Sequence, residues 1–216
     1  MTVHQIATPS HGRYLVDQPA APGPFPMLVG FHGYAQPAER MLDELVKIRG
    51  PRQWLLVSVQ ALNRFYNRAN DVVANWMTRQ DRDLAIADNL AYVEAVIAAV
   101  RRDHPTTDTI VYAGFSQGVA MAYRATAFVR SPSASGAILL AGDVPPDVAP
   151  HLAALPPLLI GRGTADEWYT ETKAAADATV FHQTGVQPTV HVFEGGHVWD
   201  PSFTARAGTF LDTMNR

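Results

Sequence analysis

Hydrophobic positions follow two patterns that alternate along the chain. Short, mostly apolar runs are typical of buried parallel strands. Longer segments with apolar residues at three- and four-residue steps are typical of helices that cover a sheet, and 81–102 is the clearest of these. The predicted strands are 11–16, 27–31, 54–59, 110–113, 136–141, 157–161 and 189–193, and the predicted helices are 39–48, 81–102, 117–128, 171–184 and 203–214.

This alternation predicts an α/β fold with a mostly parallel central sheet and helices on both faces. Residues 60–78 and 143–157 follow neither pattern, so we expect a long irregular connection and a proline-rich loop with one short turn. No shift in composition and no internal repeat divides the chain, so we expect residues 1–216 to form a single domain.

Composition narrows the classes of function. The chain is 47% hydrophobic and 17% charged, with a formal net charge of -3 and no basic block, so nucleic-acid binding is not expected. Cysteine is absent, which excludes disulfides, thiolate zinc sites and a cysteine nucleophile. No signal-peptide pattern and no apolar run long enough to span a membrane is found, so a cytoplasmic location is expected.

We expect neither metal nor cofactor. The histidines and carboxylates show no metal-ligand spacing, and no Gly-x-Gly-x-x-Gly follows the first strand as a dinucleotide site would require. The oligomeric state stays open at this point.

The most informative stretch is 109–121, in which a β-branched strand runs through Gly114-Phe115-Ser116-Gln117-Gly118 into a helix. In this context Gly-x-Ser-x-Gly predicts a sharp turn that presents the serine hydroxyl above the sheet. The glycines are needed because larger side chains would collide with the turn. The alternative is an ordinary strand-to-helix turn whose serine caps the helix.

A serine nucleophile needs a base, and in this architecture the order is serine, acid, histidine. Of the eight histidines, only His151, His182, His191 and His197 follow Ser116. His182 and His191 lie within a predicted helix and strand, whereas His197 follows the last strand in a glycine-flanked turn. We therefore predict His197 as the base.

For the acid, Asp166 follows a predicted strand and precedes His197 by one helix and one strand. Asp143 and Glu167 are the rivals, and a loop aspartate is often only a turn former or a helix cap. The oxyanion donors are predicted to be the backbone N–H groups of Gln117, directly after the nucleophile, and Tyr34, in the loop after an earlier strand.

Several short motifs together resemble a known family. They are Phe31-His32-Gly33, Gly114–Gly118, Gly163-Thr164-Ala165-Asp166, Gly196-His197 and Phe210-Leu211. The chain resembles the α/β-hydrolases, and most of all the phospholipase/carboxylesterase family, which includes the acyl-protein thioesterases. The resemblance implies an α/β-hydrolase fold with little or no lid that cleaves carboxylic esters or thioesters. By position it makes Ser116 the nucleophile, Asp166 the residue that orients the base and His197 the base.

The chain departs from the family pattern at Tyr34-Ala35-Gln36, at Val119 and at Trp168-Tyr169. These changes favour a small, uncharged ester, aryl or short-chain, over long-chain lipid or protein-thioester substrates. Aromatic residues in the loops after strands predict an apolar substrate pocket. The residues expected to line it are Tyr34, Phe65, Trp76, Trp168 and Trp199.

The sequence thus predicts a serine carboxylesterase that forms an acyl-enzyme on a small-molecule ester. A thioesterase or lysophospholipase, or an amidase or peptidase, on the same triad stays open, because the fold does not separate these activities. A ligand-binding protein without catalysis, on a hydrolase fold, is the alternative from a different class.

Overall fold

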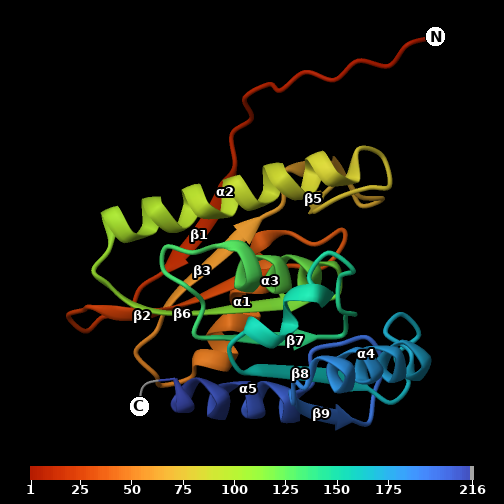
Figure 1. The fold of residues 1–216 in the computed structure, drawn as a ribbon. Coiled ribbons are helices and arrows are strands. Elements are labelled where there is room, and N and C mark those ends of the chain that lie inside the picture. Colours follow the sequence, from red (N-terminus) through yellow and green to blue (C-terminus); the bar gives the residue numbers. More distant parts are fainter. Residues whose placement is uncertain (215–216) are drawn as a thin grey trace.

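A seven-stranded sheet forms the centre of the computed structural model, which describes residues 1–214. The strand order is β1-β3-β2-β6-β7-β8-β9, in which β1 is antiparallel to β3 and every other pair is parallel (Figure 1). The mostly parallel sheet predicted from the sequence is therefore confirmed. The strands are β1 (Arg13–Asp17), β2 (Phe25–Phe31), β3 (Leu55–Gln60), β6 (Thr106–Phe115), β7 (Gly136–Leu140), β8 (Leu158–Gly163) and β9 (Thr189–Phe193).

Within residues 1–214, five α-helices cover the two faces of this sheet, as the alternating pattern predicts. They are α1 (Ala38–Arg49), α2 (Arg82–Asp103), α3 (Gln117–Phe128), α4 (Glu171–Thr184) and α5 (Pro201–Thr213). Side chains of α1 and α5 share one apolar core with Leu28, whereas those of α2, α3 and α4 share a second core with Met27 and Val29. Neighbouring residues of β2 thus enter opposite cores, because side chains alternate along a strand.

The segment 60–78 contains a β-hairpin, which corrects the expectation of an irregular connection. Its strands are β4 (Asn63–Tyr66) and β5 (Val72–Asn75), paired antiparallel with Asn63 opposite Asn75. The Asn67 side-chain oxygen accepts hydrogen bonds from the N–H groups of Ala69 and Asp71, each at 2.9 Å, and so closes the turn. The other segment, 143–157, contains the single short turn that was expected, the 3-10 helix η1 (Ala149–Ala154).

The hairpin is joined to the loop that follows β2. The Ala35 N–H donates to the Ala74 carbonyl at 3.0 Å, and the Ala74 N–H donates to the Gln36 carbonyl at 3.3 Å. These bonds fix the β2 loop from one side. In the part of the chain that the structure describes, no separate cap domain covers the strand ends, and no helix has the length and apolarity needed to cross a membrane.

Residues 1–12 run away from the sheet and are exposed along their whole length (Figure 1). The Gln5 side chain donates a hydrogen bond to Asp81 at 2.6 Å, and the His11 carbonyl accepts one from Arg64 of β4 at 3.1 Å.

Candidate active site

Ser116 is the single residue between β6, which ends at Phe115, and α3, which begins at Gln117. Its backbone has φ 54° and ψ -120°, a positive φ that L residues rarely adopt. The Ser116 N–H donates to the Leu140 carbonyl of β7 at 2.9 Å, which ties the turn to the neighbouring strand. Such a conformation persists only where the surrounding structure imposes it, and such positions are concentrated at functional sites.

Gly114 and Gly118 show why the turn needs small residues on both sides. A Cβ atom on Gly118 would lie 2.0 Å from the Phe31 carbonyl oxygen, and one on Gly114 would lie 2.4 Å from the Gly118 carbonyl oxygen. Both obstacles are backbone atoms, so neither is relieved by rotating a side chain. The steric reason given for the motif thus applies to both glycines.

His197 and Asp166 are hydrogen bonded across the loops that follow β9 and β8. The His197 Nδ1 lies 2.9 Å from Asp166 Oδ2 and 3.0 Å from Asp166 Oδ1. Asp166 is only 5% exposed, and its Oδ1 also accepts the N–H groups of Trp168 and Tyr169, each at 2.8 Å. These donors fix the orientation of the carboxylate, as is required of a residue that holds one tautomer of a histidine base.

The three predicted residues meet at one edge of the sheet. Parallel strands end at the same edge, and β6, β7, β8 and β9 are consecutive neighbours. The His197 ring centroid lies 4.9 Å from that of Phe115, the residue directly before Ser116. Within residues 1–214 the Ser116 hydroxyl makes no hydrogen bond to His197, and catalytic hydrogen bonds are often long before substrate binds.

The backbone N–H groups of Tyr34 and Gln117 are the predicted oxyanion donors. Neither donates a hydrogen bond to any residue in the range 1–214. Tyr34 lies in the loop after β2, and Gln117 is the first residue of α3. The end of β2 and the start of α3 are close together, since a Cβ atom on Gly118 would lie 2.0 Å from the Phe31 carbonyl oxygen. The Gln117 N–H is one of the free donors at the start of α3, and preorganised N–H donors of this kind stabilise a developing oxyanion.

His32 fixes the loop that carries Tyr34. Its Nδ1 lies 2.7 Å from the Gly33 carbonyl and its Nε2 accepts the Ala61 N–H at 3.1 Å, so the proton is on Nδ1. The ring is fully buried, and this burial lowers the pKa of His32, which keeps it neutral. The Gly33 N–H donates to the Gln36 side-chain oxygen at 3.0 Å, which closes the turn.

The side chain of Gln117 has a role that the sequence analysis did not include. Its Oε1 accepts the Trp76 N–H at 2.9 Å, and its Nε2 donates to the Met77 carbonyl at 3.1 Å. The residue after the serine is thereby joined to the segment just beyond β5. In the sequence, the only hint of this role was a long polar side chain, Gln117, between the nucleophile candidate and Gly118.

The five predicted pocket residues divide into two groups. Tyr34 and Trp168 are 60% and 72% exposed, the Tyr34 ring lies 5.7 Å from that of Phe65, and the Trp168 ring lies 6.5 Å from that of His197. The half-buried Trp199 ring packs 5.8 Å from that of Phe115. These four therefore surround the strand ends.

Trp76 differs from this group, because it has no exposed surface and its indole N–H donates to the His32 carbonyl at 2.8 Å. The prediction that Trp76 lines the pocket is therefore wrong, and Trp76 is a core residue beneath the site. The burial follows from edge-on packing against Phe31, at a centroid distance of 5.4 Å.

The rival residues lie in other surroundings. Asp143 is exposed and has Lys173 at 3.8 Å, and Glu167 is exposed beside Asp166. His191 bonds to the Ser202 hydroxyl at 2.9 Å. Within residues 1–214, no group of three or more histidine, cysteine, aspartate or glutamate side chains is arranged to hold a metal ion.

Comparison with solved structures identifies the fold. A Bacillus cereus carboxylesterase superposes with a TM-score of 0.73 at 14% identity, covering 94% of each chain. The chain has the α/β-hydrolase fold. A Zea mays acyl-protein thioesterase 2 shares this hydrolase fold with a TM-score of 0.72 at 19% identity, covering 94% of this chain and 99% of that one. A Mesorhizobium loti carboxylesterase does so with a TM-score of 0.66 at 19% identity, covering 87% and 88%.

No protein-family model matches the chain, and no curated protein matches it by sequence. The hydrolase fold is thus shared with esterases at an identity that carries information on architecture alone.

Proposed function

We propose that this protein is a serine hydrolase that cleaves carboxylic esters. The observation that carries the proposal is the hydrogen bond between the buried Asp166 carboxylate and the His197 ring, at the same strand ends where Ser116 occupies a strained turn. A serine hydroxyl is a weak nucleophile until an oriented base takes its proton. The unused N–H groups of Tyr34 and Gln117 supply the remaining requirement, a site for the oxyanion.

In the proposed mechanism, Ser116 Oγ attacks the ester carbonyl while His197 Nε2 removes its proton. Asp166 keeps the other proton of the ring on Nδ1 and stabilises the imidazolium that forms. The tetrahedral oxyanion accepts hydrogen bonds from Tyr34 and Gln117. His197 then gives its proton to the leaving alcohol, and water attacks the acyl-enzyme with His197 again acting as base.

We infer that the substrate is a small, uncharged ester with an aryl or short acyl part. Tyr34 and Trp168 are exposed aromatic side chains that flank the serine loop and the acid loop, and an aromatic face suits an apolar group of limited size. The Trp168 ring lies 6.5 Å from the ring of His197, so in the proposed mechanism it would contact the leaving alcohol or the acyl group.

The test is hydrolysis of p-nitrophenyl esters from acetate to palmitate by the wild-type chain and by Ser116→Ala. We expect turnover that is highest for short acyl chains and is lost by a factor of about 10⁴ or more in the variant. Covalent labelling of the wild type, but not of Ser116→Ala, by a fluorophosphonate probe is the independent check. Gly185→Ala, distant from the strand ends, serves as the control variant and keeps wild-type turnover.

Two outcomes would overturn the proposal in different ways. Labelling without turnover of any ester would favour an amidase or peptidase on the same residues. Absence of both labelling and turnover in folded protein would favour a ligand-binding protein. A preference for palmitate or for long acyl thioesters would retain the mechanism and refute the proposed substrate class.

A further inference from the structure

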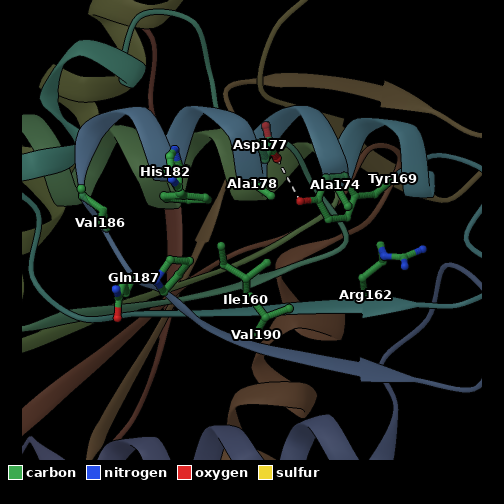
Figure 2. A pocket seen from close by; sticks show the side chains of 13 residues that line it. Ile160, Arg162, Tyr169, Ala174, Asp177, Ala178, His182, Val186, Gln187 and Val190 are labelled. Atoms are coloured by element: carbon green, nitrogen blue, oxygen red, sulfur yellow. Dashed lines mark hydrogen bonds between the residues drawn. The ribbon is translucent and has the colours of Figure 1, made fainter.

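A second concave site lies away from the serine loop, between α4 and the strands β8 and β9. Figure 2 shows its lining side chains, with Arg162 and Tyr169 near one end and Val186 and Gln187 near the other. The cavity has a volume of about 600 Å³, within the usual range for small-ligand sites. Ser116, His197 and the oxyanion residues are not among the residues that line it.

The cavity exists because α4 presents small side chains to the sheet. Ala174 and Ala178 face the space above β8, where larger residues would fill it (Figure 2). On the strand side, Ile160 and Val190 form the floor, and Val190 is 58% exposed although it is apolar. Between Ala174 and Gly185 the helix axis advances about 16 Å, so the space is elongated along the helix.

Among the described residues that line this space, Arg162 on β8 is the only arginine, and there is no lysine. In residues 1–214 no carboxylate lies within 4.0 Å of its guanidinium, and its one hydrogen bond is to the Gly163 carbonyl at 3.5 Å. An arginine fork that is not paired within the protein matches the two oxygens of a carboxylate.

The nearby carboxyl group, Asp177, is already occupied. Its Oδ2 accepts the Tyr169 hydroxyl at 2.9 Å and the Val144 N–H at 3.2 Å, and burial raises its pKa (Figure 2). A ligand carboxylate would therefore be drawn to Arg162, while its chain would lie along the apolar side chains of α4 and β9. One charged end and an elongated apolar body are the features of an aliphatic carboxylate.

We propose that this cavity binds a medium-chain aliphatic carboxylate, with the carboxylate on Arg162 and the chain extended along α4. The inference goes beyond the proposed function, because it uses no residue of the serine, histidine or oxyanion loops. The proposed ligand is nevertheless related to the proposed function, since ester hydrolysis releases a carboxylate. Tyr169 connects the two sites, because its ring lines the cavity and its backbone N–H holds Asp166.

The test is calorimetric titration of the full chain with hexanoate, octanoate and decanoate. Each added methylene that is buried should strengthen binding about fourfold. Decanoate should bind about tenfold more tightly than decanol in the wild type, because of the charged hydrogen bonds to Arg162. In Arg162→Met the two ligands should bind alike, whereas Arg206→Met, which removes an exposed arginine of α5, should leave the wild-type difference intact.

A second variant tests the cavity independently of the charge. Ala178→Phe places a ring in the space between α4 and Val190, so decanoate binding should be lost while hydrolysis of p-nitrophenyl acetate continues. Absence of decanoate binding to the wild type would overturn the proposal, as would unchanged binding in both Arg162→Met and Ala178→Phe. A dimer seen by sedimentation, dissociated by Ala178→Phe and indifferent to decanoate, would assign the cavity to a second copy of the chain instead.

Discussion

The carboxylate of Asp166 is held by three partners, which are the N–H groups of Trp168 and Tyr169 and the ring of His197. Asp166→Asn keeps the shape but offers an amide N–H where His197 Nδ1–H now donates, so the ring is driven into the wrong tautomer. We expect kcat for a short p-nitrophenyl ester to fall by about 10⁴ with little change in the thermal midpoint.

The matched control for this carboxylate is Asp143→Asn. Asp143 was the rival acid, and it is exposed and faces Lys173. We expect it to retain ester turnover within about twofold, since surface ion pairs contribute little. If Asp143→Asn were the inactive variant and Asp166→Asn the active one, the assignment of the acid would be wrong.

Gly118 is the residue with the least room in the site. In Gly118→Ala the new methyl group would meet the Phe31 carbonyl oxygen at 2.0 Å, so either α3 or β2 must move. Both movements displace an oxyanion donor, and we expect kcat to fall by at least about 10². Gly185→Ala, which has positive φ but open space around it, should lose only about 1 kcal/mol of stability in urea unfolding and no turnover.

At the level of residues, sequence order indicated the three side chains that the structure brings to one edge of the sheet. Ser116 follows from its motif, and Asp166 and His197 follow from their places after later strands. Trp76 could not be placed in this way, because its burial depends on Phe31 and on the His32 carbonyl. Local sequence contains no information on contacts across such separations.

At the level of elements, the hairpin β4–β5 and the residues just after it hold the β2 loop and Gln117, which carry the two proposed oxyanion donors. Gln117→Glu has nearly the same shape but turns an acceptor toward the Met77 carbonyl, where Nε2–H now donates. We expect the backbone near Trp76 to withdraw and kcat to fall by about tenfold or more, although the backbone N–H of residue 117 is retained.

The control for this variant is Gln183→Glu, an exposed position on α4 that should leave kcat unchanged. Gln117→Glu with wild-type kcat would show that the hairpin does not position the donor. The hairpin itself was missed because its two strands are only four residues each. Its alternation is masked by Asn and Arg, whereas helix α4 has the predicted bounds because Thr170 caps its start and Gly185, in the left-handed conformation, ends it.

At the level of the whole molecule, an ion pair between a buried arginine and a partly exposed aspartate joins α3 to the segment before η1. Arg124 is 1% exposed and bonds to both oxygens of Asp147, at 2.7 and 2.8 Å, and these hydrogen bonds lower the pKa of Asp147 to about 2. We expect Asp147→Asn to lower the free energy of unfolding at pH 7 by about 2 kcal/mol. This is less than the loss of about 3–5 kcal/mol for a fully buried pair, because Asp147 is partly exposed.

The sign of the pH dependence follows from the lowered pKa. The ionised carboxylate stabilises the fold above the unfolded pKa of about 3.9, and this contribution disappears as the pH falls through about 2. The difference between wild type and Asp147→Asn in urea unfolding should therefore shrink in acid. Asp103→Asn, which removes an exposed surface pair with Arg102, should leave the free energy of unfolding nearly unchanged at every pH.

Strand β9 has a neighbour on one side only and is mostly exposed, yet the loop that follows it carries His197. Edge elements of this kind open at a lower free energy than the core. Catalytic failure and denaturation should therefore be separate events, with esterase activity disappearing at a lower urea concentration than the far-ultraviolet circular dichroism of the sheet and helices. On dilution of the urea the activity should return without a slow refolding phase, because only β9 has to pair again with β8.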